Sequence, residues 1–338
     1  MTTLVLTDQD VRRLLPMRVC IDVMAGAFSA LARGDTVLPL RTVLQVGDGV
    51  NALASMPAVV GSGPSASLGA KVITVFPGND ATPYDSHSGV VLLFDAEFGR
   101  LLALADASSI TAIRTAAVSG LATRLLARED AESVAMLGAG VLAMPHLEAM
   151  CAVRPIRRAT IWSPSAAQPG SRASALAEAA RNAFGISVEV CESAASAVRT
   201  ADIVCTVTAS RTPVLHGDWL REGTHVNAVG ASIRTARELD SAAVQRAEFF
   251  ADRRESVLAE SGDFLIPLSE GVIDERHLRA ELGELVTGAH PGRSSRSVVT
   301  VFKSLGLAIE DVAALRHIHA RAIESGRGVL IELGGIRH

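Results

Sequence analysis

The feature that most constrains this chain is a glycine-rich turn between an apolar segment and a helix-prone one. The run Gly138-Ala139-Gly140-Val141-Leu142-Ala143 follows the segment SVAML at residues 133–137. In such a turn the first glycine permits a tight bend, the second lets the backbone approach a pyrophosphate, and the small last residue lets helix and strand pack closely. The free N–H groups at the start of the helix then face the phosphates. The turn therefore predicts a dinucleotide site, and the alternative is a glycine-rich turn that binds nothing.

The segments around this turn alternate between short apolar runs and helix-prone stretches. The predicted strands are 133–137, 158–162, 186–191, 201–209 and 225–231, and the predicted helices between them include 141–153 and 171–183. Such alternation is typical of a parallel sheet covered on both faces. The sequence thus predicts an α/β fold with a doubly wound, Rossmann-type parallel sheet.

The first third of the chain has a different texture, and 338 residues are enough for two cores. Thr7 and Asp10 form a helix-start pattern, and a second helix is predicted from Met17 to Arg33. Residues 37–104 contain short β-branched runs between turn signals, with a hairpin turn from Asp95 to Arg100. We therefore expect an α+β domain here. Further helices are predicted at 109–127, bridging the two domains, at 238–245 and at 306–324, the last folding back onto the first domain.

Composition narrows the class of protein. A net charge of -4 gives no overall field for nucleic acid, and no apolar run is long enough to cross a membrane. The beginning of the chain lacks the pattern of a secretory signal. The cysteines and histidines show no metal-ligand spacing, so no metal site is expected. We expect a cytoplasmic protein whose partner is a small molecule, with no nucleic acid and no membrane.

Five segments in order along the chain resemble the ornithine cyclodeaminase/mu-crystallin family. They are LGAKVITVFPGN (68–79), DASSITAIRTAAVSGLAT (106–123), GAGVLAMPHLEAM (138–150), VGASIRTARELD (229–240) and GRSSRSVVTVFKSLGLAIEDVAA (292–314). The resemblance implies a substrate-binding and dimerisation domain (1–112 and 312–338), a Rossmann dinucleotide-binding domain (113–311) and a homodimer. It also implies NAD(H) or NADP(H) as cofactor.

The resemblance assigns the substrate side to four residues. Arg41 and Arg114 look like the pair that holds a substrate carboxylate, and Lys71 looks like the catalytic lysine. A guanidinium binds a carboxylate bidentately, and a desolvated lysine can exchange a proton near neutral pH. Alternatively, Arg41 and Lys71 are exposed strand charges and Arg114 is a helix-surface cation. His87 either donates a hydrogen bond to the substrate or caps a strand.

The cofactor side is assigned in the same way, beyond the glycine turn. The residues are Arg114, Thr115, Gly138, Ala139, Gly140, Val141, Leu142, Ser163, Thr206, Val207, Thr208, Val229, Gly230 and Ser294. Thr206 and Thr208 could equally be ordinary β-formers. The tip of the second strand, Trp162-Ser163-Pro164-Ser165, carries neither an acid that would repel a 2′-phosphate nor an adjacent arginine, so the choice between NAD(H) and NADP(H) stays open.

Two positions depart from the cyclodeaminase pattern. Cyclodeaminases carry Gly-Ala-Asp after the last of these strands, where this chain has Gly230-Ala231-Ser232, and their following lysine aligns with Ala236. A serine hydroxyl cannot replace a carboxylate base near neutral pH without activation. The resemblance then implies an NAD(P)H-dependent reductase of an α-imino acid, such as pyrroline-2-carboxylate, piperideine-2-carboxylate or an acyclic 2-imino acid, to the L-amino acid. The alternatives are an ornithine cyclodeaminase-type lyase, an amino-acid dehydrogenase and a mu-crystallin-like NADP-dependent binding protein.

Overall fold

A computed structural model describes residues 2–47 and 49–334, so parts of the predicted first domain (residues 1, 48 and 335–338) lie outside the described residues. The chain divides into two compact units, which we call unit 1 (Met1–Arg114 with Gly306–His338) and unit 2 (Thr115–Leu305). The boundary after Arg114 falls inside helix α3 (Ala107–Leu126).

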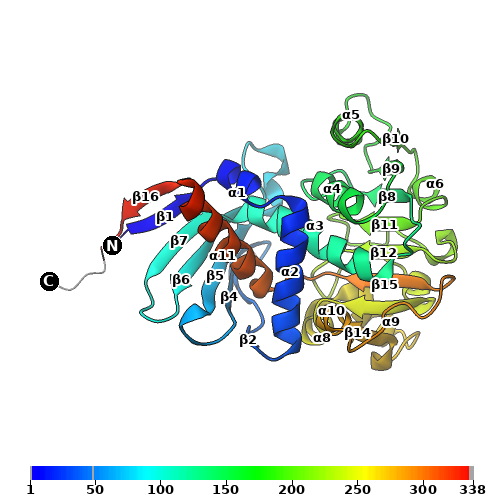
Figure 1. The fold of residues 1–338 in the computed structure, drawn as a ribbon. Helices are drawn as coiled ribbons and strands as arrows, with labels where there is room; N and C mark the ends of the chain where they lie inside the picture. Colours follow the sequence, from blue (N-terminus) through cyan, green and yellow to red (C-terminus); the bar gives the residue numbers. More distant parts are fainter. Residues whose placement is uncertain (1, 48, 335–338) are drawn as a thin grey trace. The chain divides into compact units, whose positions relative to one another are not determined.

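Unit 1 is an α+β unit whose sheet has the order β16-β1-β7-β6-β5-β4-β2, with β3 paired to β4 (Figure 1). The predicted hairpin at Asp95 to Arg100 joins β6 to β7, and the predicted helix start at Thr7 is a capping box with Asp10. Its strands are β1 (Thr2–Leu6), β2 (Thr36–Val37), β3 (Thr42–Val46), β4 (Asn51–Val60), β5 (Ser67–Val75), β6 (His87–Asp95), β7 (Leu101–Asp106) and β16 (Val329–Glu332). Its helices are α1 (Asp8–Leu14), α2 (Met17–Ala32), α11 (Ala308–Ser325) and the short η1 (Gly63–Ser65) and η2 (Pro77–Ala81).

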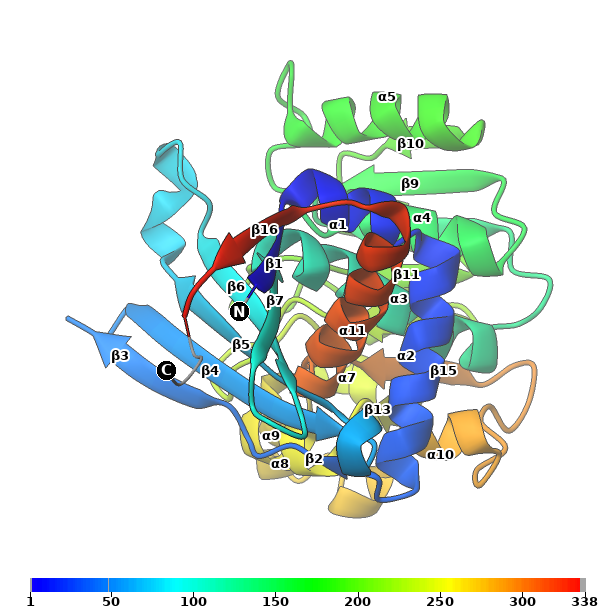
Figure 2. The ribbon, with the colours of Figure 1, turned by 60° about the vertical axis from the view of Figure 1, so that its left-hand side comes forward.

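Helix α11 comes from the far end of the sequence and packs on the sheet of unit 1, as the sequence predicts (Figure 2). It contacts β4, β5 and β6 on one side and α2 on the other. Ile309, Val312, Leu315 and Ile318 are buried at helical spacing and form its apolar face. Because this face is buried from its first turn onward, the charged residues of that turn are buried too.

Unit 2 contains an eight-stranded sheet of order β10-β9-β8-β11-β12-β15-β13-β14, and every pairing in it is parallel. The predicted doubly wound, Rossmann-type sheet is confirmed. Its strands are β8 (Ser133–Leu137), β9 (Arg158–Trp162), β10 (Ser187–Val190), β11 (Ile203–Thr206), β12 (His225–Ala228), β13 (Ala247–Ala251), β14 (Leu278–Glu281) and β15 (Val299–Lys303). Its helices are α4 (Ala143–Val153), α5 (Arg172–Phe184), α6 (Ala194–Val198), α7 (Ser241–Gln245), α8 (Arg254–Glu260), α9 (Gly262–Ser269), α10 (Leu282–Thr287) and the short η3 (Gly217–Trp219) and η4 (Glu275–His277).

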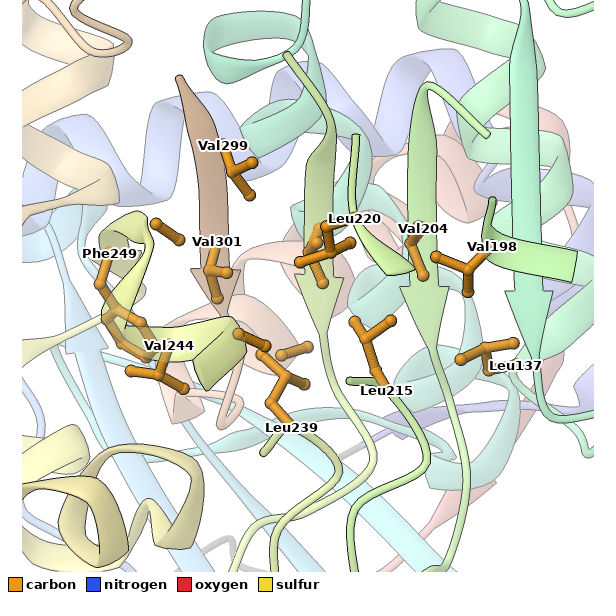
Figure 3. Packing of buried hydrophobic residues seen from close by; sticks show 14 of the residues in the cluster. Leu137, Val198, Val204, Leu215, Leu220, Leu239, Val244, Phe249, Val299 and Val301 are labelled. Carbon is orange, nitrogen blue, oxygen red and sulfur yellow. The ribbon is translucent and has the colours of Figure 1, made fainter. Parts of the chain in front are cut away.

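The chain order reverses between β8 and β11, and this switch point is where ligands bind in sheets of this kind. Beneath it lies a core of apolar side chains that includes Leu137, Val204, Leu215, Val301 and Phe249 (Figure 3). This packing fixes the ends of β8, β11 and β12, and therefore the loops that follow them.

Three predicted helices begin two or three residues later than expected, and one of them, predicted from residue 306, begins at Ala308. The helix predicted from residue 141 begins at Ala143, because Val141 and Leu142 form a turn in which Ala143 N donates to Gly140 O. The helix predicted from residue 238 begins at Ser241, because the Asp240 side chain caps it. In unit 2 the strands β13, β14 and β15 were not predicted, and in unit 1 neither were β1 and β16.

Within the described residues, none of the helices reaches the length and hydropathy of a membrane span by itself. Helices α1 and α2 reach them only when taken together, and the chain bends by 82° between them.

Candidate active site

The chain contains only two lysines among its 32 basic residues, and both are buried in ion pairs. Lys71 of β5 is 2% exposed, and its Nζ lies 2.9 Å from Asp311 Oδ2 in unit 1. Lys303 of β15 is fully buried, and its Nζ lies 2.9 Å from Asp263 Oδ2 in unit 2. The alternative that Lys71 is an exposed strand charge is therefore wrong.

Lys71 belongs to a buried cluster of four charged residues, which we call the charge cluster: Lys71, Arg114, Glu310 and Asp311. Arg114 Nε donates to Asp311 Oδ1 at 3.0 Å, and Arg114 Nη1 donates to Glu310 Oε2 at 2.5 Å. Both carboxylates stand in the first turn of α11. The apolar face of α11 packs on the sheet and so holds this first turn against it. Asp311 thus contacts the lysine with one oxygen and the arginine with the other. Arg114 is not the helix-surface cation of the alternative interpretation.

Burial and neighbouring charges decide the protonation of this cluster. Burial, and then the charge of Arg114, lower the pKa of Lys71 to about 8, while Asp311 opposes the shift. Burial also disfavours the charged form of Arg114, but Asp311 and Glu310 outweigh it and raise its pKa. Arg114 and Lys71 likewise overcome the effect of burial on Asp311 and lower its pKa. Lys71 is therefore the member of the cluster that exchanges a proton near neutral pH.

The two arginines predicted to hold a carboxylate meet at Gly306. Arg41 Nη2 donates to Gly306 O at 3.3 Å, and a Cβ on Gly306 would lie 2.8 Å from Arg114 Nη1. Gly306 has a φ of +80°, which disfavours any larger residue there. Arg114 commits Nε and Nη1 to carboxylates, and within the described chain its Nη2 makes no hydrogen bond. That N–H group is left to meet a ligand.

His87 is the first residue of β6 and is solvent-exposed. Its Nδ1 lies 3.1 Å from Ser86 Oγ, and its carbonyl accepts a hydrogen bond from Ser108 Oγ at 2.8 Å. Desolvation of the ring and the charge of Lys71 lower the pKa of His87, which favours the neutral imidazole. Its role as a hydrogen-bond donor to substrate stays a prediction.

The glycine turn of unit 2 lies at the switch point. Gly138 has a φ of +115°, and a Cβ there would lie 2.7 Å from the carbonyl oxygen of Val207, so only glycine fits. A Cβ on Gly140, by contrast, would meet no described atom within 4 Å. Val141, 79% exposed, follows it. The backbone at Gly140 is thus open to a close approach, as a pyrophosphate requires.

Glu238 organises the loops that follow β11 and β12, and the sequence did not point to it. Its carboxylate accepts hydrogen bonds from Thr206 Oγ1 at 2.8 Å, Thr208 N at 2.8 Å, Thr208 Oγ1 at 2.7 Å and Gly230 N at 2.6 Å. The hydroxyls of Thr206 and Thr208 are therefore bonded to Glu238, although both residues lie at the predicted edge of the sheet. Val207 and Val229, also predicted, are buried in the same two loops.

Lys303 and Asp263 hold Glu238 and its loop in place. Asp263 Oδ1 accepts hydrogen bonds from the backbone N–H groups of Glu238 at 2.8 Å and Leu239 at 3.0 Å. Lys303 Nζ also donates to Ala231 O at 2.5 Å. The sequence does contain a signal for this pair, since Lys303 stands at the end of one apolar run and Asp263 directly before another. A charge in such a run requires a buried partner.

The remaining predicted cofactor residues are only partly brought together. Ser163 follows β9 at the carboxyl edge of the sheet and is buried, and its hydroxyl has no hydrogen-bond partner among the described residues. Thr115, the first residue of unit 2, is also buried. Ser294 precedes β15 and its N–H donates to Glu248. Because the sheet is parallel, Ser294 lies at the amino edge, away from the glycine turn. The family motif placed Ser294 near β15 but did not indicate at which edge of the sheet it lies.

A family model for the ornithine cyclodeaminase/mu-crystallin family matches residues 1–326 of the chain. The chain belongs to this family. A Δ1-pyrroline-2-carboxylate reductase of Bacillus cereus is 36% identical over 330 residues, which cover 97% of this chain and 99% of the relative. The resemblance stated from the sequence is confirmed.

Two solved structures share this fold. The Thermococcus litoralis Δ1-pyrroline-2-carboxylate reductase in complex with NADH and L-proline has a TM-score of 0.92 and 40% identity, covering 97% of this chain and 99% of that one. An archaeal alanine dehydrogenase dimer with bound NAD has a TM-score of 0.91 and 30% identity, covering 99% and 100%.

Proposed function

We propose that this family member is an NAD(P)H-dependent reductase that converts an α-imino acid to the L-amino acid. The observation that carries the proposal is the placement of a buried lysine, which exchanges its proton near pH 8, beside a buried arginine with a free N–H group. Relatives that reduce pyrroline-2-carboxylate and a structure that holds NADH and L-proline support it.

Each group has a defined task in this reaction. Arg114 Nη2 and Arg41 bind the carboxylate of the substrate at Gly306, and Lys71 gives a proton to the imine nitrogen. A reduced nicotinamide, when bound, supplies the hydride that adds to the imine carbon. The C=N double bond becomes a CH–NH single bond, and Lys71 is left neutral until it regains a proton from solvent.

The residues of unit 2 fit a dinucleotide. The open backbone at Gly140 and the N–H groups of the turn would hold the pyrophosphate, and Ser163 stands at the tip of the second strand. The unpartnered Ser163 hydroxyl provides a group for the adenosine ribose. No acid stands there to repel a 2′-phosphate and no adjacent arginine stands there to bind one, so the cofactor is NADH or NADPH and both belong in the assay.

Reductive amination of a 2-oxo acid is the second candidate, because the archaeal alanine dehydrogenase shares the fold at 30% identity. The same residues would hold the carboxylate and move the proton. A cyclodeaminase reaction is disfavoured by Ser232 and by the buried Ala236, which offer no acid or base. Tight NADPH binding without turnover would instead favour a mu-crystallin-like binding protein.

The test is a cofactor-oxidation assay with NADH and NADPH against cyclic imines and against 2-oxo acids with and without ammonium. We expect turnover of at least one cyclic imine without ammonium, and Lys71→Met should abolish it while leaving NADH binding unchanged. Wild-type rates in that variant would refute the assignment of Lys71. Activity that appears only with ammonium would establish the second candidate.

We also propose a homodimer in which a second copy covers the outer hairpin of unit 1. Every residue of β3 is exposed, and Leu44 and Val46 of β3 share one apolar face with Leu53 of β4, which pairs with Leu44; Leu44 is 62% exposed. The alanine dehydrogenase relative is a dimer. Leu44→Asp should therefore yield monomers in light scattering, whereas Phe98→Ser, at an exposed hairpin tip, should not. An unchanged mass for Leu44→Asp would place the interface elsewhere.

We place the enzyme in the cytoplasm, because its four cysteine thiols are free and a reducing compartment keeps them so. Cell fractionation with an antibody to the chain tests this.

A further inference from the structure

We propose that Asp311 is a positioning residue that keeps Lys71 charged and couples its proton to carboxylate binding at Arg114. The chemical part of this inference rests on the proposed function, in which Lys71 protonates the imine. The charge of Lys71 itself can be measured without any reaction.

The geometry carries the proposal. Lys71 projects from β5 into apolar surroundings, since its registered neighbours on β4 and β6 are Met56 and Val91. A fully buried lysine without a counter-ion loses its proton at about pH 5–6. The only close partners of its Nζ in the described chain are Asp311 Oδ2 at 2.9 Å and Thr111 Oγ1 at 3.5 Å. Asp311 therefore supplies the charge that retains the proton on Lys71.

The other groups around Lys71 do not replace Asp311. Arg114 and His87 oppose the positive charge of Lys71, and Glu310, whose carboxylate is paired with Arg114, favours that charge less than Asp311 does. Cys20 of α2 faces Arg114 and Glu310, and burial raises its pKa, so it stays a neutral thiol. The groups that face Lys71 from β6, α3 and α11 are thus His87, Thr111, Arg114, Glu310 and Asp311.

The coupling follows from the two oxygens of Asp311. Oδ1 accepts a hydrogen bond from Arg114 Nε while Oδ2 contacts Lys71, so the two cations share one anion. The two cations and two anions of the charge cluster cancel. A carboxylate that binds at Nη2 of Arg114 therefore adds negative charge near Lys71. Substrate binding therefore strengthens the hold of Lys71 on its proton until the imine nitrogen takes it.

The low lysine content makes a direct test possible. Protein labelled with [ε-13C]lysine gives signals from two side chains only, Lys71 and Lys303, and Lys71→Met assigns them. We expect Lys71 to titrate near pH 8 in the wild type. Asp311→Asn should lower this midpoint by about one pH unit or more, a tenfold change in proton binding. The matched control Glu310→Gln, which removes the carboxylate that is paired with Arg114, should lower it less.

Activity provides a second measurement. In Asp311→Asn the alkaline fall of kcat/KM should move to lower pH together with the Lys71 midpoint, and Asp311→Glu should restore both. A midpoint unchanged in folded Asp311→Asn overturns the proposal. If neither variant folds, the titration of Lys71 in the wild type tests the proposal. A midpoint of about 5–6 is that of a buried lysine without a counter-ion and would also overturn the proposal. Absence of imine reduction with a shifted midpoint would instead refute the proposed function alone.

Discussion

Replacing Glu238 removes one carboxylate that fastens two loops of the dinucleotide site. In Glu238→Ala the backbone N–H groups of Thr208 and Gly230 lose their acceptor, whereas the two threonine hydroxyls can turn toward other partners. A fully buried N–H without a partner costs about 1–3 kcal/mol, and because these two N–H groups are partly buried we expect the lower part of the summed range, about 2–3 kcal/mol for the pair. In Glu238→Gln the amide oxygen still serves one of the two N–H groups, so the expected cost is about half as large.

The assay is a fluorescence titration with NADH combined with denaturant unfolding. If about 1.4 kcal/mol of the loss must be recovered when the loops order around the cofactor, the Kd for NADH rises tenfold. We expect a Kd increase of that order for Glu238→Ala, a smaller one for Glu238→Gln, and none for the control Glu270→Gln, whose ion pair with Arg237 is exposed. A Kd for Glu238→Ala within about twofold of the wild type would refute the reasoning, since that is under 0.5 kcal/mol.

Three further predictions concern the two sites. The pKa of Lys71 is lowered to about 8 and the reaction uses its protonated form, so kcat/KM for imine reduction should be flat below this pH and fall as the pH rises through it, measured with saturating NADH. Gly138→Ala places a Cβ 2.7 Å from Val207 O at a φ of +115°, so NADH binding measured by calorimetry should weaken at least about tenfold, or about 1.4 kcal/mol. Gly140→Ala has open space at its Cβ and should leave the free energy of unfolding unchanged. Gly306→Ala displaces the Arg114 guanidinium, so KM for the imino acid should rise about tenfold with the Kd for NADH unchanged, and an equal rise in both would contradict the placement of the arginines.

The central strands of unit 2 could be predicted because each is a short apolar run between turn signals. Strand β8 is buried along its whole length, and its prediction at 133–137 is correct to the residue. Strand β15 was not predicted, since Lys303 ends an otherwise apolar run and only its contact with Asp263 explains a charge there. Strand β14 contains Arg279 and Glu281, and its pairing with the distant β13 stabilises it rather than its own pattern.

The residues of the candidate site also differ in whether the sequence could predict them. Lys71, Arg41 and Arg114 could be named from motifs, but Glu310 and Asp311 stand in the first turn of a helix, where acidic residues are usually solvent-exposed and favour the helix dipole. Only the packing of α11 on the sheet buries them and turns them toward Arg114 and Lys71. Glu238 was predicted as the first residue of a helix, whereas the structure places it in the loop before α7. Three of the four hydrogen bonds that its carboxylate accepts come from Thr206 and Thr208, which are 32 and 30 residues away in the sequence.

Apart from its two buried lysines, this chain carries its basic side chains as arginine, which holds its proton until about pH 12 or above. The charge of the outer surface therefore changes little on the alkaline side of neutrality, where most proteins lose the charge of many lysines at once. A change in activity or spectrum between neutral and mildly alkaline pH can therefore be assigned to a buried group, because few surface groups titrate in that range. A mildly basic buffer then changes mainly the protonation of Lys71.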